Sequence, residues 1–215
     1  MKAFVITIMD NPKSVAAADR CVRSGATWGV PVEKFEAITP SDSPIKIASE
    51  KQIPIEGFEE KYSRFDRCLS AFLSHYSLWE KCIEERQPMV VLEHDAYFVN
   101  GLPLFIGGHI ANLGQPSYGR FRIPQILGEG PLQSKRYLPG AHGYYIDPKG
   151  AKLLVEKAST DAAPTDVFIN LDHFKDIKEL YPWPIEARDS FTTIQNETGC
   201  GAKHNWHKDS NYEIL

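Results

Sequence analysis

Apolar residues gather in two short runs and one long periodic segment in the first half of the chain. Residues 3–8 and 89–92 are almost entirely apolar, as in strands buried on both faces of a parallel sheet. Over residues 64–86 apolar side chains recur at steps of three and four, which predicts an amphipathic helix that ends at Gln87-Pro88. Strand, helix and strand in this order indicate an α/β architecture with nucleotide-binding topology.

Weaker patterns predict further elements along the chain. They are a helix over residues 13–25, strands over 32–38 and 143–146, and helices over 150–159 and 165–180. The segments 39–62 and 100–140 are broken by proline, glycine and charged residues, which predicts a surface loop and a long connection. The chain beyond Thr198 is polar. We therefore expect one domain over residues 1–198 and a polar tail over 199–215.

Length and net charge bear on the stability of the fold and on its possible partners. The chain has 215 residues and a formal net charge of −4. A chain of this length buries a core without metal or disulfide staples. The acidic balance gives no overall attraction to nucleic acid or to an anionic membrane, although it leaves room for a local basic groove.

Apolar stretches and cysteines indicate the compartment. No stretch reaches the about 18 apolar residues that a membrane-spanning helix needs, and the short apolar start is unlike a secretory signal. Cys68 and Cys82 fall on one predicted helix, about 21 Å apart, so they cannot pair while it stands. We expect reduced thiols and a cytoplasmic location.

An acidic cluster follows the second apolar strand directly. Glu93-His94-Asp95 comes straight after residues 89–92, and ligands of open α/β sheets bind outside the carboxyl ends of the strands. Two carboxylates at positions i and i+2 can hold Mg²⁺ or Mn²⁺ and leave coordination positions open for a substrate diphosphate. The alternative is a solvated acidic turn.

Six segments, in order along the chain, resemble the motifs of glycosyltransferase family 25, the group with lipooligosaccharide galactosyltransferases and collagen galactosyltransferase domains. They are residues 4–8, 35–38, 68–79, 91–96, 140–151 and 164–166. Ser74-His75 takes the place of the Ser-His pair on the family's helix, followed by its typical Leu-Trp. Glu93-His94-Asp95 takes the place of Glu-Asp-Asp, so the outer acidic pair is kept and His94 departs from the pattern.

This resemblance implies a GT-A type fold in a single domain with a mostly parallel central sheet. It also implies transfer of a sugar from a nucleotide-diphosphate donor. Glu93 and Asp95 would hold the metal, Mn²⁺ or Mg²⁺. Donor contacts are expected from a set of residues near the strand ends and motif positions: Thr7, Ser74, His75, Glu93 and His142.

Two histidines are candidates for contacts with the donor. His75 on an amphipathic helix is either a packed side chain or a neutral imidazole that positions a donor hydroxyl or phosphate. His142 lies in a glycine-flanked bend, where the backbone can approach a ligand closely.

Two aspartates are candidates for the catalytic base. Asp166 follows Pro164 and is either an acidic residue at a helix start or the group that deprotonates the attacking hydroxyl. Asp189 is a weaker candidate for the same role. Lys135-Arg136 is either a phosphate contact or an exposed basic turn, and the loosely spaced His204, His207 and Asp209 fit a solvated tail.

The resemblance therefore implies a metal-assisted, inverting hexosyltransferase. We expect a UDP-sugar donor, galactose or glucose as the sugar, and an acceptor hydroxyl on a surface glycan or glycolipid at the inner membrane face. One alternative is transfer to hydroxylated bases of DNA, which the acidic charge disfavours. Another is a nucleotide-sugar binding module without catalysis, to which His94 points.

Overall fold

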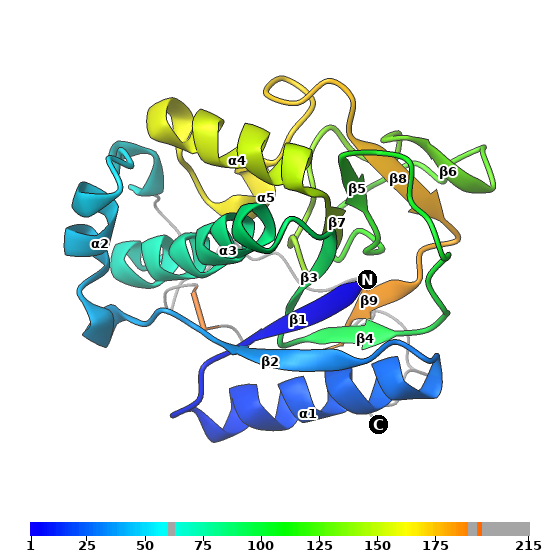
Figure 1. Cartoon of the computed structure of the whole chain (residues 1–215), viewed down its shortest axis with the longest axis horizontal. Helices are drawn as coiled ribbons and strands as arrows, with labels where there is room; N and C mark the ends of the chain where they lie inside the picture. The colour runs from blue at the N-terminus through cyan, green and yellow to red at the C-terminus, as the bar shows by residue number, and fades with distance from the viewer. Residues whose placement is uncertain (60–62, 189–192, 195–215) are drawn as a thin grey trace.

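The computed structural model describes residues 1–59, 63–188 and 193–194, and its centre is a seven-stranded mixed sheet (Figure 1). The strand order is β2-β1-β3-β7-β5-β8-β6. The strands are β1 (Lys2–Thr7), β2 (Val32–Glu36), β3 (Met89–Glu93), β5 (Ile110–Asn112), β6 (Gly128–Pro131), β7 (Gly143–Ile146) and β8 (Lys178–Tyr181). Only β7 and β6 run against the other five, as their antiparallel pairings with β3, β5 and β8 require.

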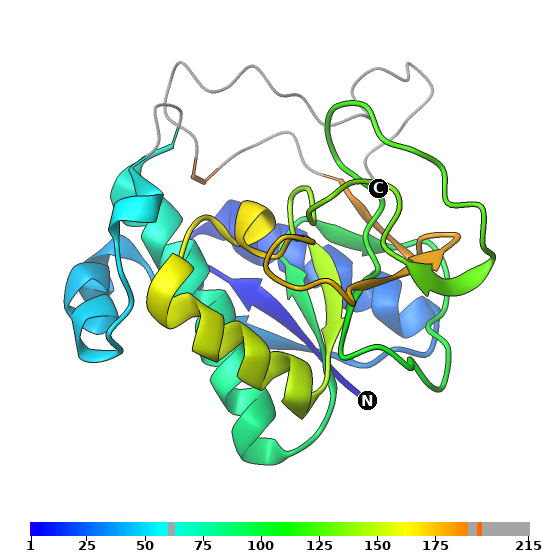
Figure 2. The same ribbon diagram turned by 90° about the horizontal axis from the view of Figure 1, so that it is seen from above.

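Helices cover both faces of this sheet. Helix α1 (Pro12–Thr27) lies on one face, and helices α3 (Phe65–Glu85) and α4 (Pro148–Asp161) pack against each other on the opposite face (Figures 1 and 2). A second sheet of β4 (Ala96–Phe98) and β9 (Ile185–Ala187) lies on the α1 side. The short helices are α2 (Pro44–Glu50), α5 (Thr165–Phe168), η1 (Pro40–Asp42) and η2 (Glu56–Phe58).

Strand β1 shows how the sequence produces these layers. Ala3 and Val5 are buried in the apolar cluster under α1, and Phe4 and Ile6 are buried in the cluster under α3 and α4. Successive side chains of a strand point to opposite faces, so a continuous apolar run serves two cores at once. Both clusters share one sheet, which confirms the predicted single α/β domain with a mostly parallel sheet.

The strongest predicted helix is confirmed within a residue at each end. Helix α3 buries Leu69, Phe72 and Trp79 completely and ends at Glu85, followed by Arg86 in a left-handed conformation with φ 52°. Helix α1 is capped by Asn11, whose side chain accepts hydrogen bonds from the backbone N–H groups of residues 13 and 14.

The predicted helix over 165–180 is wrong. Helix α5 ends at Phe168, and the chain returns as β8. The cause is Asn170, whose side chain accepts hydrogen bonds from the backbone N–H groups of Asp172 and His173 and so replaces helical bonds with a turn.

The two segments that were expected to lack regular structure contain some. Residues 39–62 include α2 and both 3₁₀ helices, and Pro40 and Pro44 occupy the first positions of η1 and α2, where proline is favourable. Residues 100–140 contain β5 and β6. Strands β4 and β9 have three residues each, too short for a periodic signal.

The described cysteines are buried thiols. Cys21, Cys68 and Cys82 form no disulfide, and burial raises the pKa of Cys21 and Cys82 to about 12. Neither therefore supplies a thiolate at neutral pH. Within the part of the chain that is described, no helix is long and apolar enough to cross a membrane. The predicted tail, with His204, His207 and Asp209, lies outside the described residues.

Candidate active site

A cavity of about 530 Å³ opens at the carboxyl ends of β1, β2 and β3. This end of a parallel sheet is where open α/β folds bind ligands. Part of its wall is apolar and comes from the strand ends, including Ile6, Ile8 and Ile38. The polar wall comes from the start of α1, helix α3 and the end of β3, including Asn11, His75 and Glu93.

A chain of hydrogen bonds runs from the helix layer into this cavity. Trp79 Nε1–H donates to the Tyr144 hydroxyl oxygen over 2.8 Å, and Tyr144 Oη lies 3.0 Å from His75 Nδ1. Nε2 of His75 lies 3.2 Å from Glu93 Oε1. The buried Tyr144 hydroxyl needs an acceptor for its own proton, and Nδ1 provides it. His75 therefore carries its proton on Nε2 and donates it to the Glu93 carboxylate.

Burial fixes the protonation of this pair. His75 is 1% exposed, and desolvation lowers its pKa from 6.5 to about 3, so the imidazole is neutral at physiological pH. Burial, followed by the negative charge of Asp95, raises the pKa of Glu93 well above its ordinary 4.5. A carboxylate of this kind is stabilised by any cation that enters the cavity.

His94, the departure from the acidic motif, holds the β1–α1 turn. Its Nδ1 lies 3.2 Å from the Ser14 hydroxyl, which also accepts a hydrogen bond of 2.9 Å from the Ile8 backbone N–H. Ser14 is completely buried. The middle position of the motif thus ties the end of β3 to the start of α1.

Asp95 presents an unsatisfied acceptor at the outer position. Its backbone oxygen accepts a hydrogen bond of 2.9 Å from Arg188 N–H. Its Oδ1 is buried and has no hydrogen-bond partner among the described residues. An orphaned buried carboxylate oxygen is costly unless a cation satisfies it.

The residues present fit a divalent ion that is shared with a substrate. The described parts of the chain contain no group of three or more His, Cys, Asp or Glu side chains that could hold a metal by themselves. Glu93 and Asp95 supply two carboxylates, and Mg²⁺ commonly takes one or two carboxylates and completes its shell with water and phosphate oxygens.

Asp166 lies at the start of α5, as predicted, and is held by a tyrosine. Its Oδ2 accepts a hydrogen bond of 2.6 Å from Tyr118 Oη, and its Oδ1 accepts one of 2.9 Å from the Val167 backbone N–H. Its charge opposes the lowering of the His75 pKa by desolvation, and it adds to the effect of burial and Asp95 in raising the pKa of Glu93, so all three groups belong to one electrostatic site. Asp189 lies outside the described residues.

Tyr118 has aromatic and basic neighbours that the sequence did not reveal. Lys135 Nζ lies 5.0 Å from the centre of the Tyr118 ring and 5.2 Å from that of Tyr137. Arg136 instead forms an exposed ion pair with Asp172. No pattern in the glycine- and proline-rich loop pointed to Tyr118, because its partner is 48 residues away in sequence.

Of the other predicted donor contacts, Ser74 reaches the cavity and Thr7 does not. The Ser74 hydroxyl is buried in the cavity wall, where it accepts a hydrogen bond of 2.9 Å from the Ile38 backbone N–H. The Thr7 hydroxyl is buried and donates to the Val5 carbonyl over 3.0 Å, while its neighbours Ile6 and Ile8 line the cavity.

His142 supports β3 from the adjacent strand. Its backbone oxygen accepts a hydrogen bond of 3.1 Å from Glu93 N–H, and its ring is 2% exposed. A methyl group on Gly114 would lie 2.5 Å from Nε2, so the ring requires glycine there. His142 therefore lies next to the motif through its backbone.

The structure thus combines one α/β domain with two carboxylates, Glu93 at the end of β3 and Asp95 just after it. Residues 2–107 match the family described as glycosyltransferase family 25 (LPS biosynthesis protein). This match confirms the motif resemblance to glycosyltransferase family 25 and supports a glycosyltransferase enzyme.

Other comparisons find only distant similarity. No curated protein matches the sequence. The structure titled A197 from STIV has a TM-score of 0.38 and 8% identity, over 89% of this chain and 96% of that chain. CTP:phosphocholine cytidylyltransferase (LicC) from Streptococcus pneumoniae has a TM-score of 0.41 and 11% identity, over 88% of this chain and 93% of that chain.

Proposed function

We propose that the protein transfers a hexose, galactose or glucose, from a UDP-sugar to a hydroxyl of a surface glycan or glycolipid. The observation that carries this proposal is Glu93 in the wall of the cavity at the carboxyl end of β3, followed two residues later by Asp95, whose buried Oδ1 has no hydrogen-bond partner among the described residues. The proposed location is cytoplasmic, at the inner membrane face.

The cavity suits the nucleotide part of the donor. Its volume of about 530 Å³ lies within the roughly 300–1,000 Å³ of typical small-molecule sites. The apolar side chains Ile6, Ile8 and Ile38 offer a surface for a base, and Asn11 and Thr39 offer polar groups at its rim. The diphosphate would extend toward Glu93.

Glu93 and Asp95 would hold Mn²⁺ or Mg²⁺, which supplies positive charge to the departing diphosphate when it is bound. The protein contributes orientation. Trp79, Tyr144 and His75 fix one oxygen of Glu93, and His94 with Ser14 fixes the backbone between the two carboxylates.

Asp166 would take the proton of the acceptor hydroxyl as it attacks the anomeric carbon. The hydrogen bond from Tyr118 orients its carboxylate. A single base and a single displacement give inversion at that carbon. Lys135, between the two tyrosine rings, adds a positive charge on the acceptor side.

The structural role of His94 favours an enzyme over a binding module without catalysis. The imidazole joins the β1–α1 turn to β3, so the change from aspartate is accounted for by this contact and leaves both outer carboxylates. Transfer to hydroxylated DNA bases is the other alternative, and the net charge of −4 disfavours it.

The test is a thermal-shift panel of UDP, GDP and their sugars, each with Mn²⁺, Mg²⁺ or EDTA, followed by an assay of UDP release. We expect stabilisation by UDP compounds only with metal, and none in Asp95→Ala. The control is Asp10→Ala, which removes an exposed carboxylate from the wall of the same cavity. No shift with any nucleotide at millimolar concentration would refute the proposal.

A further inference from the structure

Large exposed apolar side chains concentrate on two loops that do not line the cavity. Leu104 and Phe105, between β4 and β5, are 105% and 81% exposed. Ile123, Ile126 and Leu127, between β5 and β6, are 57%, 44% and 76% exposed. We call these five residues the apolar edge. Exposed apolar side chains grouped in this way mark an interaction surface.

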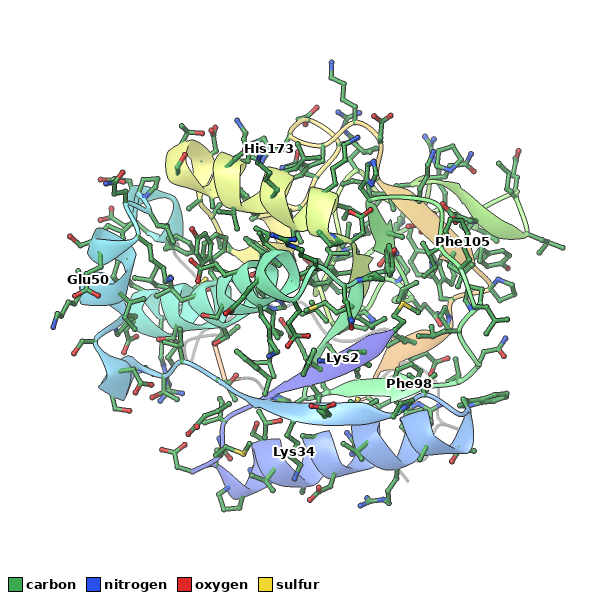
Figure 3. All side chains as sticks on the ribbon, viewed as in Figure 1. Lys2, Lys34, Glu50, Phe98, Phe105 and His173 are labelled. Atoms are coloured by element: carbon green, nitrogen blue, oxygen red, sulfur yellow. The ribbon has the colours of Figure 1, made fainter. Side chains whose placement is uncertain are left out.

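The two loops meet at β6, the last strand of the sheet. Gly107 N–H donates a hydrogen bond of 2.6 Å to Glu129 Oε2, which joins the first loop to β6. Ile126 folds over the same strand, since a methyl group on Gly130 would lie 3.2 Å from its Cβ. Figure 3 labels Phe105 at this margin of the molecule, beside β6 and β8 of Figure 1.

Basic residues accompany the apolar edge in a chain of negative net charge. Arg120 and Arg122 are exposed on the second loop, and neither is in an ion pair within residues 1–59, 63–188 and 193–194. Lys178 on β8 packs its side chain against the first loop at Gly108. Protruding apolar side chains flanked by cations match the interface of an anionic bilayer.

The edge is poorly suited to pairing with another protein strand. Strand β6 has the sequence Gly-Glu-Gly-Pro, and Pro131 lacks a backbone N–H. Short edge strands with proline resist strand addition. Leu104, Phe105 and Leu127 extend outward from loops, the arrangement that inserts between headgroups.

We propose that the apolar edge docks the protein on a bilayer that contains anionic lipid. The proposal rests on the proposed function for one point, a lipid-linked acceptor. Tyr118, which holds Asp166, lies on the same loop five residues before Ile123, at most about 18 Å along an extended chain. One loop thus connects the bilayer contact to the candidate base.

The test is flotation of the full chain with vesicles of phosphatidylcholine alone or with a quarter phosphatidylglycerol. We expect binding to the anionic vesicles and much weaker binding to the neutral ones. L104S/F105S should lose most of this binding, and R120Q or R122Q should each lower it about fivefold. Ile45→Ser, at an exposed apolar side chain on α2, is the matched control and should bind like the wild type.

Two outcomes would overturn the proposal. One is equal binding by the wild type and L104S/F105S, or no binding to either vesicle. The other is sedimentation velocity without vesicles that shows a dimer lost in L104S/F105S, because the edge then contacts a second copy. The metal-dependent nucleotide shift should be the same in all these variants, so its failure would count against the proposed function alone.

Discussion

The Nε2–H of His75 on α3 donates a hydrogen bond to Glu93 Oε1 at the end of β3, over 3.2 Å. Trp79 lies one helical turn further along α3, and both side chains reach Tyr144 on β7. The His and Trp positions of the sequence motif therefore serve one purpose. His75 contacts Glu93, the first carboxylate of the acidic motif, and Trp79 orients His75 through the buried Tyr144 hydroxyl.

Tyr144→Phe should destabilise the fold. The change leaves Trp79 Nε1–H and His75 Nδ1 without partners in a buried site, which costs about 1–3 kcal/mol. Urea unfolding measures the loss. The control is Tyr145→Phe, on the opposite face of β7, which should change the free energy of unfolding by about 0.5 kcal/mol or less. Equal effects of the two changes would contradict the hydrogen-bond chain.

Acid should remove stability that His75 provides in its neutral form. The folded pKa of His75 is about 3 against an ordinary 6.5, so the unfolded chain binds the proton more readily. The contribution is complete above pH 6.5 and falls as pH drops, by about 2 kcal/mol at pH 5. The His75→Gln variant lacks this contribution. The difference in free energy of unfolding between wild type and variant should therefore shrink by about 2 kcal/mol between pH 7 and pH 5, as measured by urea titrations.

Glu93 contributes to the pH dependence of wild-type stability with the opposite sign. Burial raises its pKa above the ordinary 4.5, so the folded state binds its proton more readily and stability declines as pH rises above 4.5. The wild-type slope is consequently shallower than His75 alone would give. A gap between wild type and His75→Gln that stays constant with pH would show that His75 titrates normally.

Asp95→Asn should separate stability from metal binding. Without metal the change neutralises a buried carboxylate whose Oδ1 has no partner among the described residues, so the free energy of unfolding should not fall. With Mn²⁺ and UDP the wild type gains about 2.7 kcal/mol at a hundred times Kd, and the variant should gain none. An apo protein markedly destabilised by Asp95→Asn would mean that this carboxylate has a structural partner.

Asp166→Asn should lower kcat by about 10²–10⁴-fold, the usual contribution of a general base, with little change in the donor-dependent thermal shift. Tyr118→Phe should lower kcat by about tenfold through loss of orientation alone. Tyr137→Phe, which changes the other ring beside Lys135, is the control. Equal kcat values for the wild type and Asp166→Asn would show that another residue is the general base.

The sequence predicted the parts of the fold that depend on neighbours along the chain. Helix α3 and strand β3 follow from periodicity, and the placement of Glu93 follows from the strand that precedes it. The contact between Ser14 and His94 joins residues 80 positions apart in the sequence, and no pattern in either segment predicts it. Asn170 ended the predicted helix because its side chain competes with the backbone, an effect that apolar periodicity does not register.

The order of strands in the sheet also determines when the sheet can be completed as the chain folds during its synthesis. Strand β7 lies between β3 and β5, and β8 lies between β5 and β6, although each is synthesised after the neighbours on both sides. The segment with both metal-binding candidates leaves the ribosome with β3 still open along one edge, and closure waits for residues 143–146. Pairing between strands that are far apart in sequence is slow, and a central strand with an unpaired edge promotes aggregation. A truncation after residue 107 would leave that edge open permanently, so the sheet needs its late-synthesised strands to be complete.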